Sequence, residues 1–181
     1  ADLNLRASVD ADAARPKWQK LFPVGTYHRP DFPEEGITFD AAFFDAMMAN
    51  WVKAGSHELP LDYFHRGDSD QSPVANDDKV ASGWFSDFEV RPDGFYGLTK
   101  WTDRARQHIL ADELCRLSPS FSIDGLDRKT GEHHGPTLYG AALLNDPFLS
   151  DLPRVTAGAT NADTQSTGSP ERAKMDKKKI C

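Results

Sequence analysis

Two stretches of the chain carry side chains that together suit acyl transfer. One is Leu-Pro-Leu-Asp-Tyr-Phe-His at 59–65, an apolar run that brings His65 to the point where the sequence turns polar. The other, about fifty residues later, is Leu-Ser-Pro-Ser-Phe at 117–121, which holds Ser118 and Ser120. A serine hydroxyl is too weakly acidic to attack an amide unless a base such as imidazole accepts its proton. A cleft that joins the two stretches would therefore support nucleophilic catalysis.

Each stretch has a simpler explanation when it stands alone. A histidine at a strand end is more often a surface or core residue than a base, and serines that alternate along a strand usually form the solvated face of a sheet. His133 and His134 lie in a polar turn without further Cys or His at ligand spacing. We therefore expect no metal and no cofactor, and the hypothesis rests on the combination of histidine and serine.

Hydrophobic periodicity predicts the elements that must position these residues. Helical spacing, with Asp40 and Thr102 as caps, predicts helices from 41 to about 54 and from 103 to about 113. A Pro-Asp-Gly turn at 92–94 predicts a β-hairpin. Alternating or β-rich runs predict strands at 18–28, 59–65, 79–91, 94–101, 114–124 and 137–144. This order is typical of an α+β fold with mostly antiparallel pairing, because hairpins rather than helices join several strands.

Length and composition indicate one domain with tails. The chain has 181 residues, of which 39% are hydrophobic, enough for one good core. We expect a flexible arm at 1–16, the folded domain at 17–153, a small-residue linker at 154–174 and a separate segment beginning at 175–181. The sequence holds no run of eighteen apolar residues and no signal-peptide pattern. Two cysteines without ligand spacing suit a reducing compartment, so a cytosolic location without membrane partners is predicted.

The charge distribution argues against nucleic-acid binding. The whole chain has a formal net charge of −7, although residues 156–181 carry five Lys and Arg against three Asp and Glu. The remaining body is thus more acidic than the whole chain. Because DNA and RNA binding needs a basic face, we expect no nucleic-acid partner.

Five ordered motifs resemble the Mu-like prophage protein I family, the capsid maturation proteases of Mu-like phages. These motifs, which span roughly residues 18 to 152, are the segments 59–65, 81–85, 93–102, 117–121 and 141–147. The layout is more distantly similar to the herpesvirus assembly proteases. The resemblance implies an α+β fold with a mostly antiparallel, barrel-like sheet and surrounding helices. It also implies a serine endopeptidase of prohead maturation that acts in the host bacterial cytoplasm, inside the assembling prohead.

The resemblance assigns roles to particular residues. His65 matches the family's histidine and would be the general base, and Ser118, the serine before the proline, matches the nucleophile. Ser120 shares its strand face and stays as the alternative nucleophile. Related viral proteases supply a third group on the strand after the serine, but the corresponding place is near Gly140, which has no functional side chain. Asp62 or Asp146 as the orienting group and a simple dyad therefore all stay open, although strand alternation would point Asp62 away from His65.

The resemblance also predicts partners. These are the phage scaffold, the major capsid protein as a further candidate, and a second copy of the chain in a homodimer. In the family a scaffolding segment follows the protease, and Met175 before a lysine run looks like that junction, so we expect self-cleavage within 156–174. The oxyanion hole would consist of backbone N–H groups, which we expect near the loop after Asn145. The alternative function is a non-catalytic assembly or scaffolding protein that keeps the same fold.

Overall fold

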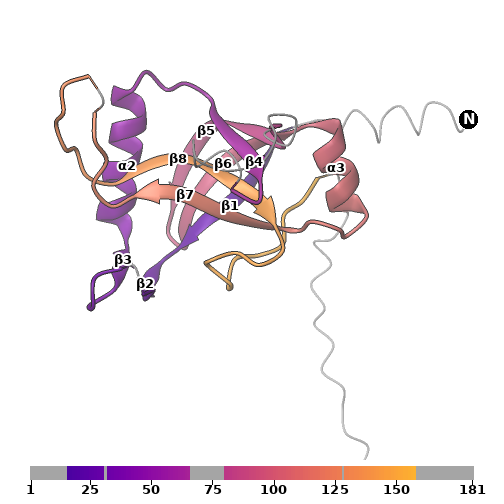
Figure 1. The fold of residues 1–181 in the computed structure, drawn as a ribbon, viewed down its shortest axis with the longest axis horizontal. Coiled ribbons are helices and arrows are strands. Elements are labelled where there is room, and N and C mark those ends of the chain that lie inside the picture. The colour runs from indigo at the N-terminus through magenta and orange to yellow at the C-terminus, as the bar shows by residue number, and fades with distance from the viewer. Residues whose placement is uncertain (1–15, 31, 66–79, 128, 158–181) are drawn as a thin grey trace, which may run out of the picture.

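A computed structural model describes residues 16–30, 32–65, 80–127 and 129–157. It is mostly β-sheet with two helices, which confirms the predicted α+β class with mostly antiparallel pairing (Figure 1). The elements in chain order are β1 Lys17–Pro23, β2 Gly25–Tyr27, β3 Ile37–Phe39, α2 Ala41–Lys53, β4 Leu59–Tyr63, β5 Gly83–Arg91, β6 Gly94–Trp101, α3 Asp103–Leu110, β7 Arg116–Ser122 and β8 Thr137–Leu144. Residues 1–15 of the arm predicted at 1–16 lie outside the described residues, as does the chain from 158 onward.

The main sheet has six strands in the order β1-β6-β5-β4-β8-β7 and curls into a half-barrel (Figure 1). Its pairs are antiparallel except for β4 and β8, which run parallel, with Leu61 opposite Ala141. The edge strands β1 and β7 approach across the open side, where the rings of Phe22 and Phe121 lie 5.1 Å apart. The parallel pair matters for function, because it places the end of β4 one strand away from the serines of β7.

The two helices begin where their caps predict. The carboxylate of Asp40 accepts from the N–H of Phe43 at 2.9 Å, and the hydroxyl of Thr102 accepts from the N–H of Ala105 at 3.2 Å. Such caps satisfy N–H groups that the first helical turn leaves without partners. The helices lie at opposite ends of the curled sheet (Figure 1). No helix among the described residues is long and apolar enough to cross a membrane.

An aromatic cluster fills the inside of the half-barrel. Its fully buried members include Phe22, Phe39, Phe44, Phe85 and Phe95, each at most 1% exposed. The rings of Phe44 on α2 and Phe95 on β6 stack at 5.7 Å, which fixes the helix against the concave face of the sheet. Aromatic side chains bury large apolar areas and favour defined geometries. This cluster therefore gives the site a rigid scaffold.

Residues 154–157, the start of the predicted linker, pack against the domain. Gln19 on β1 is only 5% exposed, and both ends of its side-chain amide make hydrogen bonds with the backbone of Thr156. Its Nε2 donates to the carbonyl of Thr156 at 2.9 Å, and its Oε1 accepts from the N–H of Thr156 at 3.2 Å. Trp101 Nε1 also donates to that carbonyl, at 3.0 Å, and Val155 donates its N–H to the carbonyl of Cys115. The folded part therefore continues at least to Ala157, which is 3% exposed.

We predict that Gln19→Leu will lower the free energy of unfolding by about 1–3 kcal/mol, because it removes the two hydrogen bonds that the buried Gln19 amide makes with the backbone of Thr156, each worth about 0.5–1.5 kcal/mol. Urea unfolding measures this change. Gln107→Leu, on the exposed side of α3, is the matched control and should change stability by less than about 0.5 kcal/mol. Equal effects of the two substitutions would mean that residues 154–157 do not support the fold.

Two features of the fold differ from the predicted elements. The strand predicted at 18–28 divides into β1 and β2, and β2 pairs with β3 in a small second sheet that periodicity did not indicate. The strand predicted at 59–65 ends at Tyr63, so His65 lies beyond it. The physical reason is that Phe64 and His65 both adopt left-handed backbone conformations, with φ of 59° and 55°, which no strand continues.

Candidate functional site

His65 is folded back toward the sheet by the turn that ends β4. Tyr63 pairs with Leu143 and Leu61 with Ala141, so a straight continuation of β4 would carry His65 well past the level of Gly140. The left-handed pair at Phe64 and His65 reverses this course. Left-handed conformations of residues other than glycine cost free energy and often mark functional sites. Here the turn brings the imidazole across β8 to β7.

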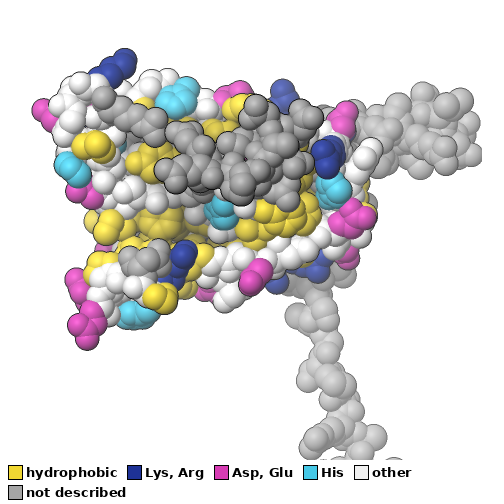
Figure 2. Space-filling view, in the orientation of Figure 1, with side chains coloured by type: hydrophobic (Ala, Val, Ile, Leu, Met, Phe, Trp, Pro, Cys, Tyr) yellow, Lys and Arg dark blue, Asp and Glu magenta, His cyan; other side chains and the backbone are white. Residues whose placement is uncertain are grey.

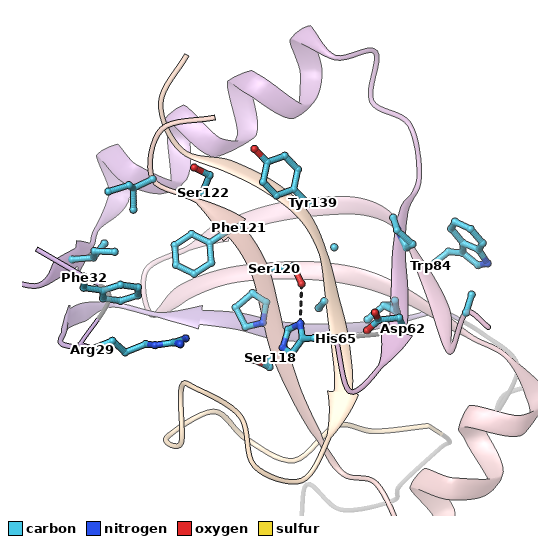
Figure 3. Close-up of a pocket in the computed structure, with 18 of the residues that line it drawn as sticks. Arg29, Phe32, Asp62, His65, Trp84, Ser118, Ser120, Phe121, Ser122 and Tyr139 are labelled. Carbon is cyan, nitrogen blue, oxygen red and sulfur yellow. Dashed lines mark hydrogen bonds between the residues drawn. The ribbon is translucent and has the colours of Figure 1, made fainter. Parts of the chain in front are cut away.

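The imidazole of His65 meets a serine of β7. His65 Nδ1 lies 3.0 Å from Ser120 Oγ, a hydrogen bond between residues 55 positions apart in sequence (Figure 3). Ser118 lies two residues earlier on the same strand and also lines the pocket, but it is only 4% exposed. In Figure 3 the imidazole lies over the segment of β7 that runs from Ser118 to Ser120. Both predicted serines and the predicted histidine are therefore brought together.

These side chains line an open pocket of about 1030 Å³. One side of it, at the left of Figure 3, presents Arg29, Phe32 and Phe121, and the other presents Trp84 and Asp62. Figure 2 shows hydrophobic side chains gathered across the middle of this same face. The reactive groups thus lie between two walls that each combine aromatic side chains with a charged one, and such a mixture is usual in ligand sites.

The pocket also holds Asp62, which strand alternation alone would direct away from His65. Because alternation stops at Tyr63, both side chains line the same pocket, and Asp62 is half-buried. Asp146 is exposed and does not belong to the pocket lining. Of the two acids considered as an orienting group, Asp62 is therefore the one that lies in the site.

Gly140 faces Ser120 across the β7–β8 pair. A Cβ atom built on Gly140 would lie 2.3 Å from the carbonyl oxygen of Pro60, because β4 and β8 approach closely there. A third catalytic side chain is therefore sterically excluded at this position.

Two other sequence features lie away from the pocket. The amide of Asn145 bridges backbone groups, donating to the carbonyl of Glu113 at 2.6 Å and accepting from the N–H of Cys115 at 3.1 Å. None of residues 145–152 lines the pocket, so they offer no support for an oxyanion hole there. His133 pairs with Asp124 at 2.7 Å, and the described residues contain no group of three or more potential metal ligands.

Sequence reasoning missed three side chains that line the pocket, namely Arg29, Trp84 and Tyr139. Trp84 and Tyr139 are 40% and 50% exposed although they lie within predicted strands. Their residue types suit a strand whether they face the core or solvent, so no local signal distinguishes them.

Comparison with known proteins gives a consistent family. A family model described as Mu-like prophage I protein, N-terminal domain, matches residues 19–156. Protease I of Escherichia phage Mu is 29% identical over 166 residues, which cover 85% of this chain and 42% of that protein. The Mu-like prophage FluMu I protein of Haemophilus influenzae is 28% identical over 162 residues, covering 82% of this chain and 42% of that protein. The chain therefore spans less than half the length of either relative. No solved structure matches, so the herpesvirus-protease likeness stays a prediction.

Proposed function

The chain belongs to the Mu-like prophage I protein family, and we propose that the pocket around His65 is the active site of a serine endopeptidase of phage head maturation. Its substrates would be the scaffold and the chain's own tail, with the capsid protein as a further candidate, inside the prohead in the host cytoplasm. The name of the Mu relative, Protease I, supports the protease activity. The hydrogen bond between His65 and Ser120 supports the serine type, because it joins an imidazole to a hydroxyl within an open pocket.

The ring nitrogen that makes this bond bears on the roles of the two serines. In serine proteases the Nδ1–H of the histidine is held by an orienting group, and Nε2 takes the proton of the nucleophile. Here Nδ1 faces Ser120. We therefore assign Ser120 as the acceptor that holds the imidazole in one tautomer, His65 Nε2 as the base, and Ser118 as the nucleophile. In this assignment Ser120 takes the place of the third catalytic group, which related viral proteases carry near the position of Gly140.

The spacing of the serines is compatible with these roles. Residues two apart on a strand lie about 6.6 Å apart on the same face, a gap that an imidazole with a hydrogen bond of about 3 Å at each nitrogen can span. Ser118 makes no such bond in this structure, and catalytic contacts often tighten only when substrate binds. Because Ser118 is 4% exposed, neighbouring atoms must move for a substrate carbonyl to reach it.

One observation favours the opposite assignment, with Ser120 as nucleophile. Ser120 is more exposed than Ser118 and already contacts the imidazole. In that arrangement Nδ1 is the base and Ser118 is a buried structural serine. The two assignments use the same pocket and the same histidine, and they differ only in which hydroxyl becomes acylated.

A fluorophosphonate probe tests the proposal, because it reacts with activated serines. We expect the wild-type chain to be labelled once, at Ser118, as located by mass spectrometry of its peptides. His65→Ala should remove the label, and Ser122→Ala, which changes another serine of β7 that lines the pocket, should retain it. Label on Ser120 would reverse the assignment. If a dimeric preparation also stays unlabelled, the non-catalytic assembly function becomes the better explanation.

The protease proposal also predicts loss of the tail on incubation. The tail beyond Ala157 should be released from the wild-type chain with time, and Ser118→Ala should keep its full mass. Residues 154–157 are held by Gln19, Trp101 and Cys115, so we expect no cut before Ala157. Intact-mass measurements follow both species, and equal loss from both would point to a contaminating protease.

A further inference from the structure

Large exposed apolar side chains gather around the His65–Ser120 contact. Trp84, Ile123 and Tyr139 are 40%, 43% and 50% exposed, and all three line the pocket. In Figure 3 Trp84 and Tyr139 lie on different sides of His65. Grouped exposed apolar residues in a concave surface usually mark a binding site, whereas single ones do not. The pocket is therefore built to cover apolar parts of a ligand on both sides of the reactive groups.

A β-bulge directs Tyr139 toward this surface. In the β7–β8 pair Ser120 lies opposite Gly140 while Phe121 lies opposite Leu138, so Tyr139 is the extra residue on β8. Bulges turn a side chain out of the regular alternation and are frequent next to active sites. The ring of Tyr139 thereby lies on the pocket side of the sheet, near Phe121 and Ser122 (Figure 3).

Arg29 supplies positive charge at the aromatic side of the pocket. Its guanidinium carbon lies 4.7 Å from the ring centre of Phe148 and 5.6 Å from that of Phe32. Arg29 is the only Lys or Arg among the described residues that line the pocket. A guanidinium that stacks on aromatic faces carries its N–H groups along its edge, where they suit the geometry of a carboxylate. Since the guanidinium has five N–H donors, it can bind a substrate carboxylate in addition to other partners.

The loop that carries Phe148 is anchored close by. The phenol of Tyr27 donates to the carboxylate of Asp151 at 2.7 Å. Burial, together with this hydrogen bond, raises the pKa of Tyr27 to about 12, so the phenol stays a donor at neutral pH. The rings of Phe32 and Phe148 meet edge to face at 5.2 Å. Arg29 is therefore held against a fixed aromatic surface.

We propose that the pocket binds an extended peptide with a large apolar side chain against Phe121 and Tyr139 and an acidic side chain at Arg29. The inference rests on the proposed function, since it places the scissile bond beside His65. Its occupant is set by complementarity, because apolar walls match an apolar side chain and the single guanidinium matches a carboxylate. Substrates of this class would be cut next to leucine- or aromatic-type residues with a nearby Asp or Glu.

Peptide binding to the Ser118→Ala/Ser120→Ala double variant tests the proposal without cleavage. Fluorescein-labelled peptides share a frame of Ala and Ser, carry Leu or Ala at the centre, and carry Glu, Gln or Lys at each flanking position in turn. Anisotropy at low ionic strength should give about tenfold tighter binding for Leu than for Ala. At one flanking position, Glu should bind about threefold tighter than Gln, and Lys should bind weakest.

Variants in the pocket should remove each preference separately. Arg29→Gln should abolish the difference between Glu and Gln, while Tyr139→Ser should reduce the difference between Leu and Ala. Arg104→Gln is the matched control, because Arg104 is an exposed arginine of α3 outside the pocket, and it should preserve both preferences. Circular dichroism of each variant checks that it is folded.

Two results separate this inference from the proposed function. Selective peptide binding with no cleavage by the wild-type chain would support the binding class and contradict the protease. Cleavage by the wild-type chain with equal affinity for every peptide, or with preferences that Arg29→Gln and Tyr139→Ser leave unchanged, would overturn the inference and leave the protease intact.

Discussion

His65→Ala is expected to lower the rate of fluorophosphonate labelling by about 10²–10⁴-fold, the range that a general base contributes. The reason is geometric, since the imidazole of His65 contacts Ser120 of β7 and lines the same pocket as Ser118. Second-order labelling rates at several probe concentrations measure the effect. The loss should persist across the pH range in which the variant stays folded, because alanine has no group to titrate.

Ser118→Ala and Ser120→Ala should reduce fluorophosphonate labelling by different amounts. Ser118→Ala removes the proposed nucleophile, so the label itself should disappear. Ser120→Ala removes the hydrogen bond at Nδ1, a type of bond worth about 0.5–1.5 kcal/mol, and should slow labelling by about tenfold or less. Ser120→Thr restores a hydroxyl at the same place and should recover most of the rate. Recovery by threonine would distinguish an orienting hydroxyl from a merely structural serine.

A larger loss of labelling in Ser120→Ala than in Ser118→Ala would be equally informative. If Ser120→Ala removes the label and Ser118→Ala only slows its formation, the nucleophile is Ser120 and Nδ1 acts as the base. If neither variant changes the rate, the labelled residue lies outside the β7 serine pair. In that case the contact between His65 and Ser120 is structural, and the pocket is not the reactive site.

Most elements of this fold, apart from the small β2–β3 sheet, were accessible from local pattern. The Phe and Met spacing in 43–51 and the cap at Asp40 predicted α2, and the Pro-Asp-Gly turn at 92–94 predicted the hairpin of β5 and β6. These signals act within a few residues and need no knowledge of distant neighbours. The fold class was reached in this way, whereas the family was reached through the resemblance of five ordered motifs.

The assembly of the site was less accessible, because it depends on long-range pairing and on backbone conformations without a sequence signal. The parallel pairing of β4 with β8 and the left-handed turn at Phe64 and His65 together decide which face the imidazole reaches. Alternation placed Asp62 away from His65, whereas the turn brings both to one pocket. Tyr139 likewise enters the pocket through a bulge that β-propensity does not reveal.

Gly140→Ala is expected to have the largest effect on the scaffold of the site. Its new Cβ would lie 2.3 Å from the carbonyl oxygen of Pro60, a backbone atom that cannot move aside without separating β4 from β8. Overpacking of this kind costs about 3 kcal/mol or more. Because His65 follows β4 and Ser120 lies across β8 from it, labelling should fall along with stability.

Gly131→Ala is the control that separates steric clash from backbone conformation. Gly131 also has a positive φ, of 75°, but nothing lies within 4 Å of its would-be Cβ. Gly131→Ala should lower the free energy of unfolding by about 1–2 kcal/mol, because alanine is disfavoured in a left-handed conformation. The folded fraction should be labelled at the wild-type rate. Urea unfolding and labelling rates compare the two variants. Equal costs, with labelling preserved in Gly140→Ala, would show that the close approach of β4 and β8 does not hold His65 over the serines of β7.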